Sequence, residues 1–232
     1  LTPQQSREIY ELVHSLQPEC MVGGRLGNDM YDFSVMGDNS YPDGTLQIAW
    51  QSPASMFNET WGYRSWQKRC PVGEKVAEKL RSLVEVVSKG GNFLLNVGPD
   101  ADGRIPQEAE RILRRLGTIK KAVGEAWENV ENVANVVEDE SCVATKRGDV
   151  LYLTYVNGVD SSGLNLKPLA RLPQKATLLN TGTALSASVV LMPSNFNEKD
   201  ITRSLHLQGI PADDLALILH ERRQNSVLVF GK

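Results

Sequence analysis

Carboxylates and aromatic side chains gather between residues 26 and 71, where they could act together. The acidic residues of this segment include Asp29, Asp32, Asp38, Asp43 and Glu59, and its large aromatic residues include Tyr31, Tyr41, Trp50, Trp61, Tyr63 and Trp66. A carboxyl group can protonate a leaving oxygen, and a flat ring can pack on a sugar face, so this combination is typical of sugar hydrolysis. Two plainer interpretations stay open, because Asp38 can cap a turn and an aromatic ring can belong to the core.

Two further polar side chains follow predicted strands. Arg25 follows Gly23-Gly24 at the end of a short apolar run at residues 20–22, and Asn96 lies near the end of the run at 93–97. In a β/α barrel the active site lies at the C-terminal ends of the strands. A guanidinium there can bind a ligand hydroxyl or pair with a catalytic carboxylate, and it can equally form a structural ion pair.

The elements that must position these residues alternate between helix and strand. A helix is predicted at residues 2–16, with Thr2 as N-cap, Pro3 in the first turn and Gln5 completing a capping box. The run at 20–22 is predicted to be a buried strand that includes Cys20. A long irregular segment follows, and loops of that length are usually functional.

The alternation continues after Pro71. A helix is predicted from there to Gly90-Gly91, whose glycines can take the positive φ that ends a helix. The run at 93–97 is continuously apolar, as in a parallel strand covered on both faces. Pro106 begins a third helix.

Beyond about residue 136 the pattern changes to short strand-like runs separated by turns. These runs lie at residues 150–156, 176–179, 189–192, 205–207, 215–220 and 227–230. They predict an antiparallel β-sandwich at 137–232 after an α/β domain at 1–136. Only two or three βα units fit before residue 136, so the first domain is either a small open sheet or the back half of a barrel.

Composition excludes several classes of function. The 232 residues carry 25 Lys and Arg against 28 Asp and Glu, a net charge of −3. Nucleic acids and anionic membranes need a basic excess, so neither is expected as the main partner. No apolar run reaches the length of a membrane span. The three cysteines and three histidines are scattered, which predicts no disulfide framework and no metal site.

Several ordered motifs together resemble the α-L-fucosidases of glycoside hydrolase family 29. They are the opening helix, VGGRLG at 22–27, YDF at 31–33, WQSP at 50–53, ETWGY at 59–63, and SKGGNFLLNVGP at 88–99 followed by DGRIP at 102–106. The resemblance is strong over residues 1–136 and weaker over the β-rich remainder. It implies a (β/α)8-like TIM barrel followed by a β-sandwich, and retaining hydrolysis of terminal α-L-fucosides without a cofactor.

The resemblance also implies that this chain is the C-terminal portion of an enzyme. The family's nucleophile, an Asp, lies on a strand just before the helix that opens this chain, and its fucose-binding histidines lie earlier still. The chain begins one residue before a helix cap, so we expect a segment upstream of Leu1 that also carries any compartment signal. Family habit implies a periplasmic, secreted or lysosomal enzyme acting on fucosylated oligosaccharides or glycoconjugates.

Three residues match family roles, and a fourth departs from the family pattern. Arg25 matches an arginine that lines the fucose pocket, Asp38 matches the general acid/base of some members, and Trp61 matches an aromatic on the sugar's apolar side. Many members have Trp-Glu where this chain has Trp50-Gln51. A carboxamide cannot cycle a proton, so Gln51 can only hydrogen-bond a hydroxyl. The acid/base is then Asp38, with Asp43 and Glu59 as alternatives, or the protein is impaired.

Other interpretations remain. Gln51 and the missing half also suit a non-catalytic carbohydrate-binding protein on the same fold. A different barrel glycosidase, such as a galactosidase, is a third possibility. Arg147-Gly148-Asp149 spells an adhesion motif, but its place between two strand-like runs predicts a hairpin turn.

Overall fold

The computed structural model describes residues 1–58, 60–133, 136, 142–155, 163–166, 175–194, 197–208 and 227–231. The chain forms two compact units. The first comprises Leu1–Arg69 and Lys89–Ala109, and the second comprises Cys70–Ser88 and Glu110–Lys232. The predicted domain boundary at residue 136 stays a prediction, and each unit is described by itself below.

The first unit opens with helix α1 (Pro3–Leu16), as predicted. The Thr2 hydroxyl accepts from the Gln5 amide at 3.2 Å, and the Gln5 side chain accepts from the Thr2 amide at 2.9 Å. This reciprocal capping box satisfies two backbone donors at the helix start. Two apolar residues of α1 are largely exposed, since Leu12 is 57% and Leu16 74% exposed.

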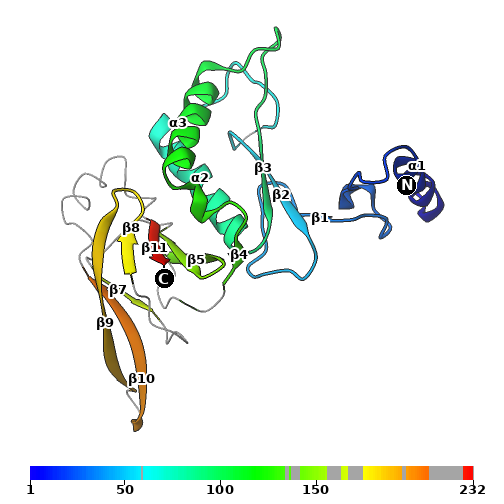
Figure 1. The fold of residues 1–232 in the computed structure, drawn as a ribbon. Coiled ribbons are helices and arrows are strands. Elements are labelled where there is room, and N and C mark those ends of the chain that lie inside the picture. The colour runs from blue at the N-terminus through cyan, green and yellow to red at the C-terminus, as the bar shows by residue number, and fades with distance from the viewer. Residues whose placement is uncertain are drawn as a thin grey trace. The chain divides into compact units, whose positions relative to one another are not determined.

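Three parallel strands form the sheet of the first unit (Figure 1). They are β1 (Ser34–Val35), β2 (Trp50–Ser55) and β3 (Asn92–Asn96), in the order β1-β2-β3. β3 confirms the strand predicted at 93–97. However, Leu94 is 44% exposed, so the expectation of cover on both faces is wrong for that residue.

The strand predicted at residues 20–22 is absent. Only an isolated bridge between Gly23 and Phe33 forms there, next to the short 3-10 helix η1 (Gly24–Leu26). The Val22 amide is bound instead by the Asp32 carboxylate at 2.6 Å, which removes it from any strand ladder. Cys20 is accordingly only half-buried, contrary to prediction.

Strand β2 lies inside the segment predicted to be irregular. It carries Pro53, which cannot donate a ladder hydrogen bond and argues against a central strand. The structure accommodates Pro53 because only its carbonyl is used, accepting from the Asn39 amide at 2.9 Å. Trp50 at the start of β2 is 1% exposed and lies where a side chain on Gly91 would collide with its ring.

The second unit contains helix α2 (Val72–Ser88) and most of helix α3 (Gln107–Val123), followed by the 3-10 helix η2 (Gly124–Ala126). Both helices match their predictions, and Gly90 takes a φ of 81° after α2. A core cluster joins the helices to the sheet of this unit. Its buried members are Leu80, Val84, Val123, Ala126, Trp127 and Tyr152.

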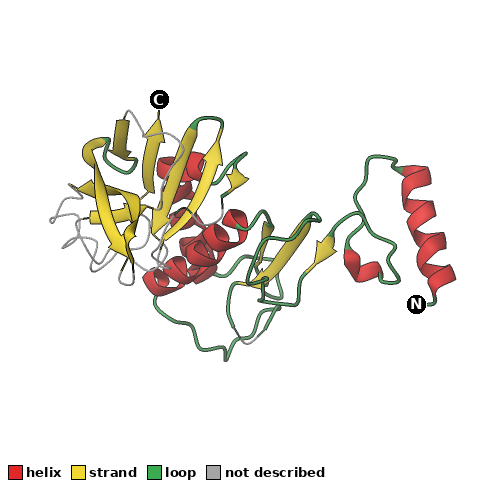
Figure 2. Cartoon of the chain, turned by 90° about the horizontal axis from the view of Figure 1, so that it is seen from below, coloured by secondary structure: helices red, strands yellow, loops and turns green. Residues whose placement is uncertain are grey.

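The sheet of the second unit has eight described strands, all antiparallel (Figure 2). Their bounds are β4 (Glu131–Asn132), β5 (Cys142–Arg147), β6 (Val150–Tyr155), β7 (Gly163–Leu166), β8 (Lys175–Leu178), β9 (Thr183–Ser194), β10 (Asn197–Gln208) and β11 (Val227–Gly231). The order is β4-β5-β6-β11-β8-β9-β10-β7. The run predicted at 215–220 lies outside the described residues. Arg147 pairs with Val150 across a two-residue turn, which confirms the predicted hairpin.

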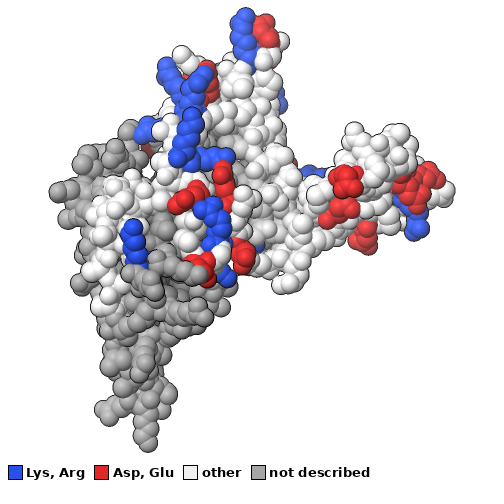
Figure 3. Space-filling model, in the orientation of Figure 1, with Lys and Arg blue, Asp and Glu red and all other residues white. Residues whose placement is uncertain are grey.

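The described elements therefore combine a parallel βα part with an antiparallel β part, as predicted. The three parallel strands form an open sheet, and no closed barrel occurs among the described residues. Figure 3 shows basic and acidic side chains next to one another on the face that it draws. Charged pairs in the described residues include Arg114–Glu110 at 2.6 Å and Lys120–Glu128 at 2.6 Å. Within the described part of the chain, no helix is both long and apolar enough to cross a membrane.

Candidate active site

The four site residues predicted from the sequence line one surface hollow of the first unit. Arg25, Asp38, Gln51 and Trp61 share it with Phe33, Val35 and Pro53. Its volume is about 310 Å³, which lies at the lower end of the range for small-molecule sites. The hollow therefore joins one carboxylate, one guanidinium, one carboxamide and one indole to an apolar floor.

Arg25 and Asp38 form an ion pair at this hollow. Arg25 belongs to η1, which is held to the next segment by the Gly24 amide donating to the Phe33 carbonyl at 2.9 Å. Its guanidinium also donates to the Met36 carbonyl at 3.4 Å. Both charged side chains are about half exposed, so a ligand can reach them.

The turn that carries Asp38 does not use the Asp38 side chain as its cap. The Ser40 amide and hydroxyl both donate to the Gly37 carbonyl, at 3.1 and 2.8 Å. Asn39, with a φ of 56°, accepts from the Ser55 amide at 2.8 Å and so docks the turn on β2. The turn-capping interpretation of Asp38 is thus not what the structure shows, because its carboxylate pairs with Arg25.

Gln51 and Trp61 reach the hollow from β2 and from the loop that follows it. Gln51 lies within β2, where its backbone carbonyl accepts from the Met36 amide at 2.9 Å. The carbonyl of Trp61 accepts from the Asn96 side chain at 2.6 Å. Asn96, noted in the sequence only as a polar residue at a strand end, thus binds the loop that carries Trp61.

The other carboxylates of this segment do not join the described hollow. Asp29, with a φ of 58°, and Asp43 are absent from its lining, and Glu59 lies outside the described residues. Asp38 is the one carboxylate among the described lining residues. No group of three or more His, Cys, Asp or Glu in the described part of the chain could hold a metal ion.

Asp32 has a structural position that its sequence context did not reveal. Its carboxylate accepts from the Tyr10 hydroxyl at 2.5 Å and from the Val22 amide at 2.6 Å, and lies 3.3 Å from His14 Nε2. The hydrogen bond from Tyr10, followed by that from Val22, lowers the pKa of Asp32. The same bond to Asp32 raises the pKa of Tyr10. Tyr10 and His14 lie one turn apart on α1, and this spacing is the feature of the sequence that could have indicated a shared contact with one side chain.

Comparisons with known proteins agree with these motifs. The profile of the family described as Alpha-L-fucosidase matches residues 2–125. The plasma alpha-L-fucosidase of Rattus norvegicus is 38% identical over 96 residues, which is 40% of this chain and 20% of that protein.

Solved structures also resemble the chain. The alpha-L-fucosidase of Vibrio sp. strain EJY3 superposes with a TM-score of 0.79 at 25% identity, covering 98% of this chain and 38% of that one. A GH29 alpha-L-fucosidase of Bacteroides thetaiotaomicron has a TM-score of 0.76 at 21% identity, covering 99% and 53%. The chain therefore spans between a fifth and about half of the relatives compared here.

The family profile covers more than half of the chain, and the two solved structures superpose on 98% and 99% of it. The chain belongs to the α-L-fucosidase family.

Proposed function

We propose that the protein carrying this chain is a glycoside hydrolase that releases terminal α-L-fucose from fucosylated glycans with retention of configuration. One observation carries the proposal. Arg25, Asp38 and Trp61, which match family roles, line the same hollow as Gln51. These groups have the chemistry to recognise and protonate a sugar.

In this proposal Asp38 is the general acid/base. It protonates the oxygen of the departing group and then removes a proton from the attacking water. Arg25 orients the Asp38 carboxylate through their ion pair, and its free donors bind a sugar hydroxyl. Gln51 hydrogen-bonds a second hydroxyl, and the Trp61 ring packs against the apolar side of fucose, including its C6 methyl.

The nucleophile in this proposal comes from a segment that precedes Leu1. Retention needs two carboxyl groups about 5–5.5 Å apart, and Asp38 is the one carboxylate among the described residues lining the hollow. The Bacteroides thetaiotaomicron relative was captured as a covalent intermediate with 2-fluoro-fucosyl fluoride, and this chain covers 53% of it. That intermediate supports a double displacement through a covalent glycosyl-enzyme.

Two preparations test the proposal. The longer protein is expected to hydrolyse an aryl α-L-fucoside, and proton NMR of the first product is expected to show the α-anomer. The 232-residue chain alone is expected to give no turnover, because it lacks the nucleophile. Turnover by the chain alone would contradict the placement of the nucleophile, and a first-formed β-anomer would contradict retention.

A binding protein is the second candidate, and Gln51 favours it. Fucose binding without turnover by the longer protein would establish that role instead. Aryl galactosides run in parallel separate a fucosidase from a galactosidase, since the expected preference is for the fucoside.

A further inference from the structure

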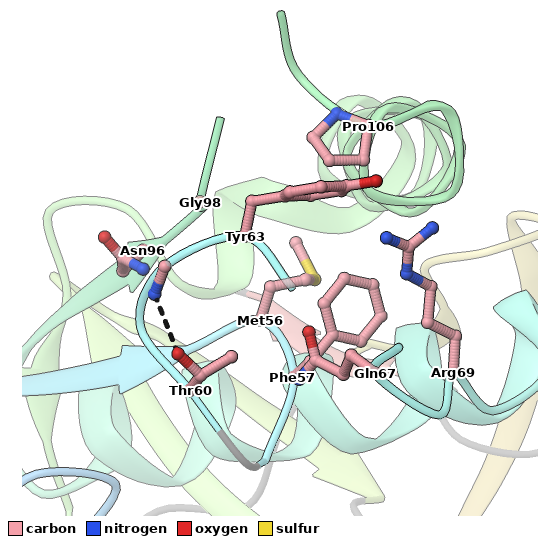
Figure 4. Close-up of a pocket in the computed structure, with 10 residues that line it drawn as sticks. Met56, Phe57, Thr60, Tyr63, Gln67, Arg69, Asn96, Gly98 and Pro106 are labelled. Carbon is pink, nitrogen blue, oxygen red and sulfur yellow. Dashed lines mark hydrogen bonds between the residues drawn. The ribbon is translucent and has the colours of Figure 1, made fainter. Parts of the chain in front are cut away.

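The loop that carries Trp61 depends on contacts from outside itself. An isolated bridge joins Phe57 to Thr60, and the Gly62 amide donates to the Thr60 hydroxyl at 3.1 Å, the dashed line in Figure 4. Regular structure resumes only where α2 begins at Val72. The orientation of the Trp61 indole therefore depends on the residues that bind the backbone of this loop.

Asn96 holds this backbone from the end of a strand. Its side-chain Nδ2 donates to the Trp61 carbonyl at 2.6 Å, and its own carbonyl accepts from the Met56 amide at 2.9 Å. Asn96 is the last residue of β3 and is in register with Ser55 of β2. One residue thus ties the ends of two paired strands to the loop.

Gly98 allows the loop to come this close. A Cβ atom at Gly98 would lie 2.6 Å from the carbonyl carbon of Gly62 and 2.7 Å from the amide nitrogen of Tyr63. Both atoms belong to the backbone and cannot rotate away, so any side chain here would displace the loop next to Trp61.

The far side of the loop is supported as well. The Tyr63 ring lies 5.6 Å from the Arg69 guanidinium, and Arg69 pairs with Glu108 at 2.8 Å. Figure 4 shows Tyr63, Arg69 and Pro106 around the same small cavity. Its volume is about 10 Å³, room for about one water molecule. The cavity therefore belongs to the support of the loop and is too small for a sugar.

We propose that Asn96 and Gly98 are positioning residues that orient Trp61 in the hollow and so set recognition of the apolar side of the sugar. This inference deepens the proposed fucosidase function and rests on it for the substrate. Neither residue lines the hollow, so both act through Trp61.

The first test reads the orientation of Trp61 without any substrate. The 232-residue chain is labelled with 5-fluorotryptophan, and Trp61→Phe assigns the Trp61 signal in the 19F NMR spectrum. Asn96→Asp, which removes the donor and keeps the shape, and Gly98→Ala are expected to shift or broaden that signal and to leave the Trp127 signal in place. Asn92→Ala, at the other end of β3, and Gly117→Ala, where a Cβ meets open space, are the matched controls.

An unchanged Trp61 signal in Asn96→Asp would overturn the proposal. If Gly98→Ala disturbs every tryptophan signal, that variant reports a loss of folding. The positioning of Trp61 is then tested with Asn96→Asp and Asn96→Ala. A control variant that moves the Trp61 signal as far as Asn96→Asp does would also overturn it.

The second test reads recognition in the longer protein. A positioned aromatic is expected to favour an aryl fucoside over the same glycoside without the C6 methyl by about tenfold. Asn96→Asp and Trp61→Ala are each expected to lose most of this preference through KM, and the double variant to lose no more than Trp61→Ala alone. A proportional fall of kcat with the preference intact would overturn the positioning role. If the wild-type protein neither binds nor hydrolyses fucosides, the proposed function fails, whereas the NMR test still decides how Trp61 is held.

Discussion

Arg25 and Asp38 form an ion pair, and both line a hollow that Gln51 and Trp61 also line. The two charged residues come from neighbouring segments that meet where Gly23 bridges Phe33. Their half-exposed side chains leave polar groups available to a ligand. Substitution of each residue alone can therefore test Asp38 as the acid/base and Arg25 as the residue that orients it.

Asp38→Asn in the longer protein is expected to lower kcat/KM for a fucoside with a poor leaving group by about a hundredfold or more, as loss of a general acid does. A substrate with an acidic phenol as leaving group needs less protonation and is expected to lose less. Steady-state rates with both substrates provide the measurement. Asp102→Asn, on an exposed turn, is the control. A larger loss in Asp43→Asn or Glu59→Gln would move the acid/base role to that residue.

Arg25→Ala is expected to reduce activity while barely changing stability. Its partner is half exposed, and solvent-exposed ion pairs contribute at most about 1 kcal/mol. Urea unfolding gives the change in stability, and kcat/KM gives the change in activity. If Arg25 acts by orienting Asp38, the activity losses of Arg25→Ala and Asp38→Asn should not add in the double variant. Additive losses of activity would show that Arg25 does not act through Asp38.

Gly91→Ala is expected to destabilise the first unit by about 1–3 kcal/mol, the usual cost of overpacking. A Cβ atom there would lie 2.4 Å from the ring of Trp50, which is almost completely buried. The unfolding free energy from urea titration, followed by tryptophan fluorescence, measures the effect. Gly44→Ala, where a Cβ meets nothing within 4 Å, is the matched control. Equal stability of the two variants would contradict the packing described around Trp50.

The contact between α1 and Asp32 is expected to weaken in acid. Because the Tyr10 hydroxyl and the Val22 amide lower the pKa of Asp32 in the folded chain, its stabilising effect is complete above its ordinary pKa, about 3.9. That effect is lost as the pH falls through the lowered value. Thermal unfolding from pH 6 to about pH 2 should therefore show a smaller acid-dependent loss in Asp32→Asn than in the wild type. Identical pH profiles would remove Asp32 from this role.

Leu80→Ala is expected to cost about 2–5 kcal/mol through the cavity it leaves. Leu80 is 1% exposed in the core cluster that joins α2 to the sheet of the second unit. Circular dichroism during urea unfolding measures the change. The comparison variant Leu12→Ala, on the exposed side of α1, should cost far less. Similar losses in both variants would contradict the packing of α2.

The sequence by itself determined the three helices and the family. Thr2 and Gln5 form a capping box from neighbouring backbone groups, and the apolar spacing in α2 and α3 is a property of consecutive turns. The family is recognised from motifs such as ETWGY and NFLLNVGP and from their order along the chain, both of which are read without knowledge of the fold. The same local information predicted a strand at residues 20–22 and missed β2. Strand pairing depends on partners that are distant in the sequence. At residues 20–22 the Val22 amide donates to the Asp32 carboxylate and no strand forms, whereas in β2 Pro53 pairs in register with Leu94 of β3.

Only the tertiary structure decided how the site residues combine. From the sequence, Asp38 could be either a turn cap or a catalytic acid. In the structure the Ser40 hydroxyl donates to the Gly37 carbonyl and closes the turn, and the Asp38 carboxylate pairs with Arg25. It also gave Asn96 a partner in Trp61, which no spacing along the chain could reveal. The physical reason is that helices follow from contacts within a few residues, whereas a site is made where distant segments close upon one another.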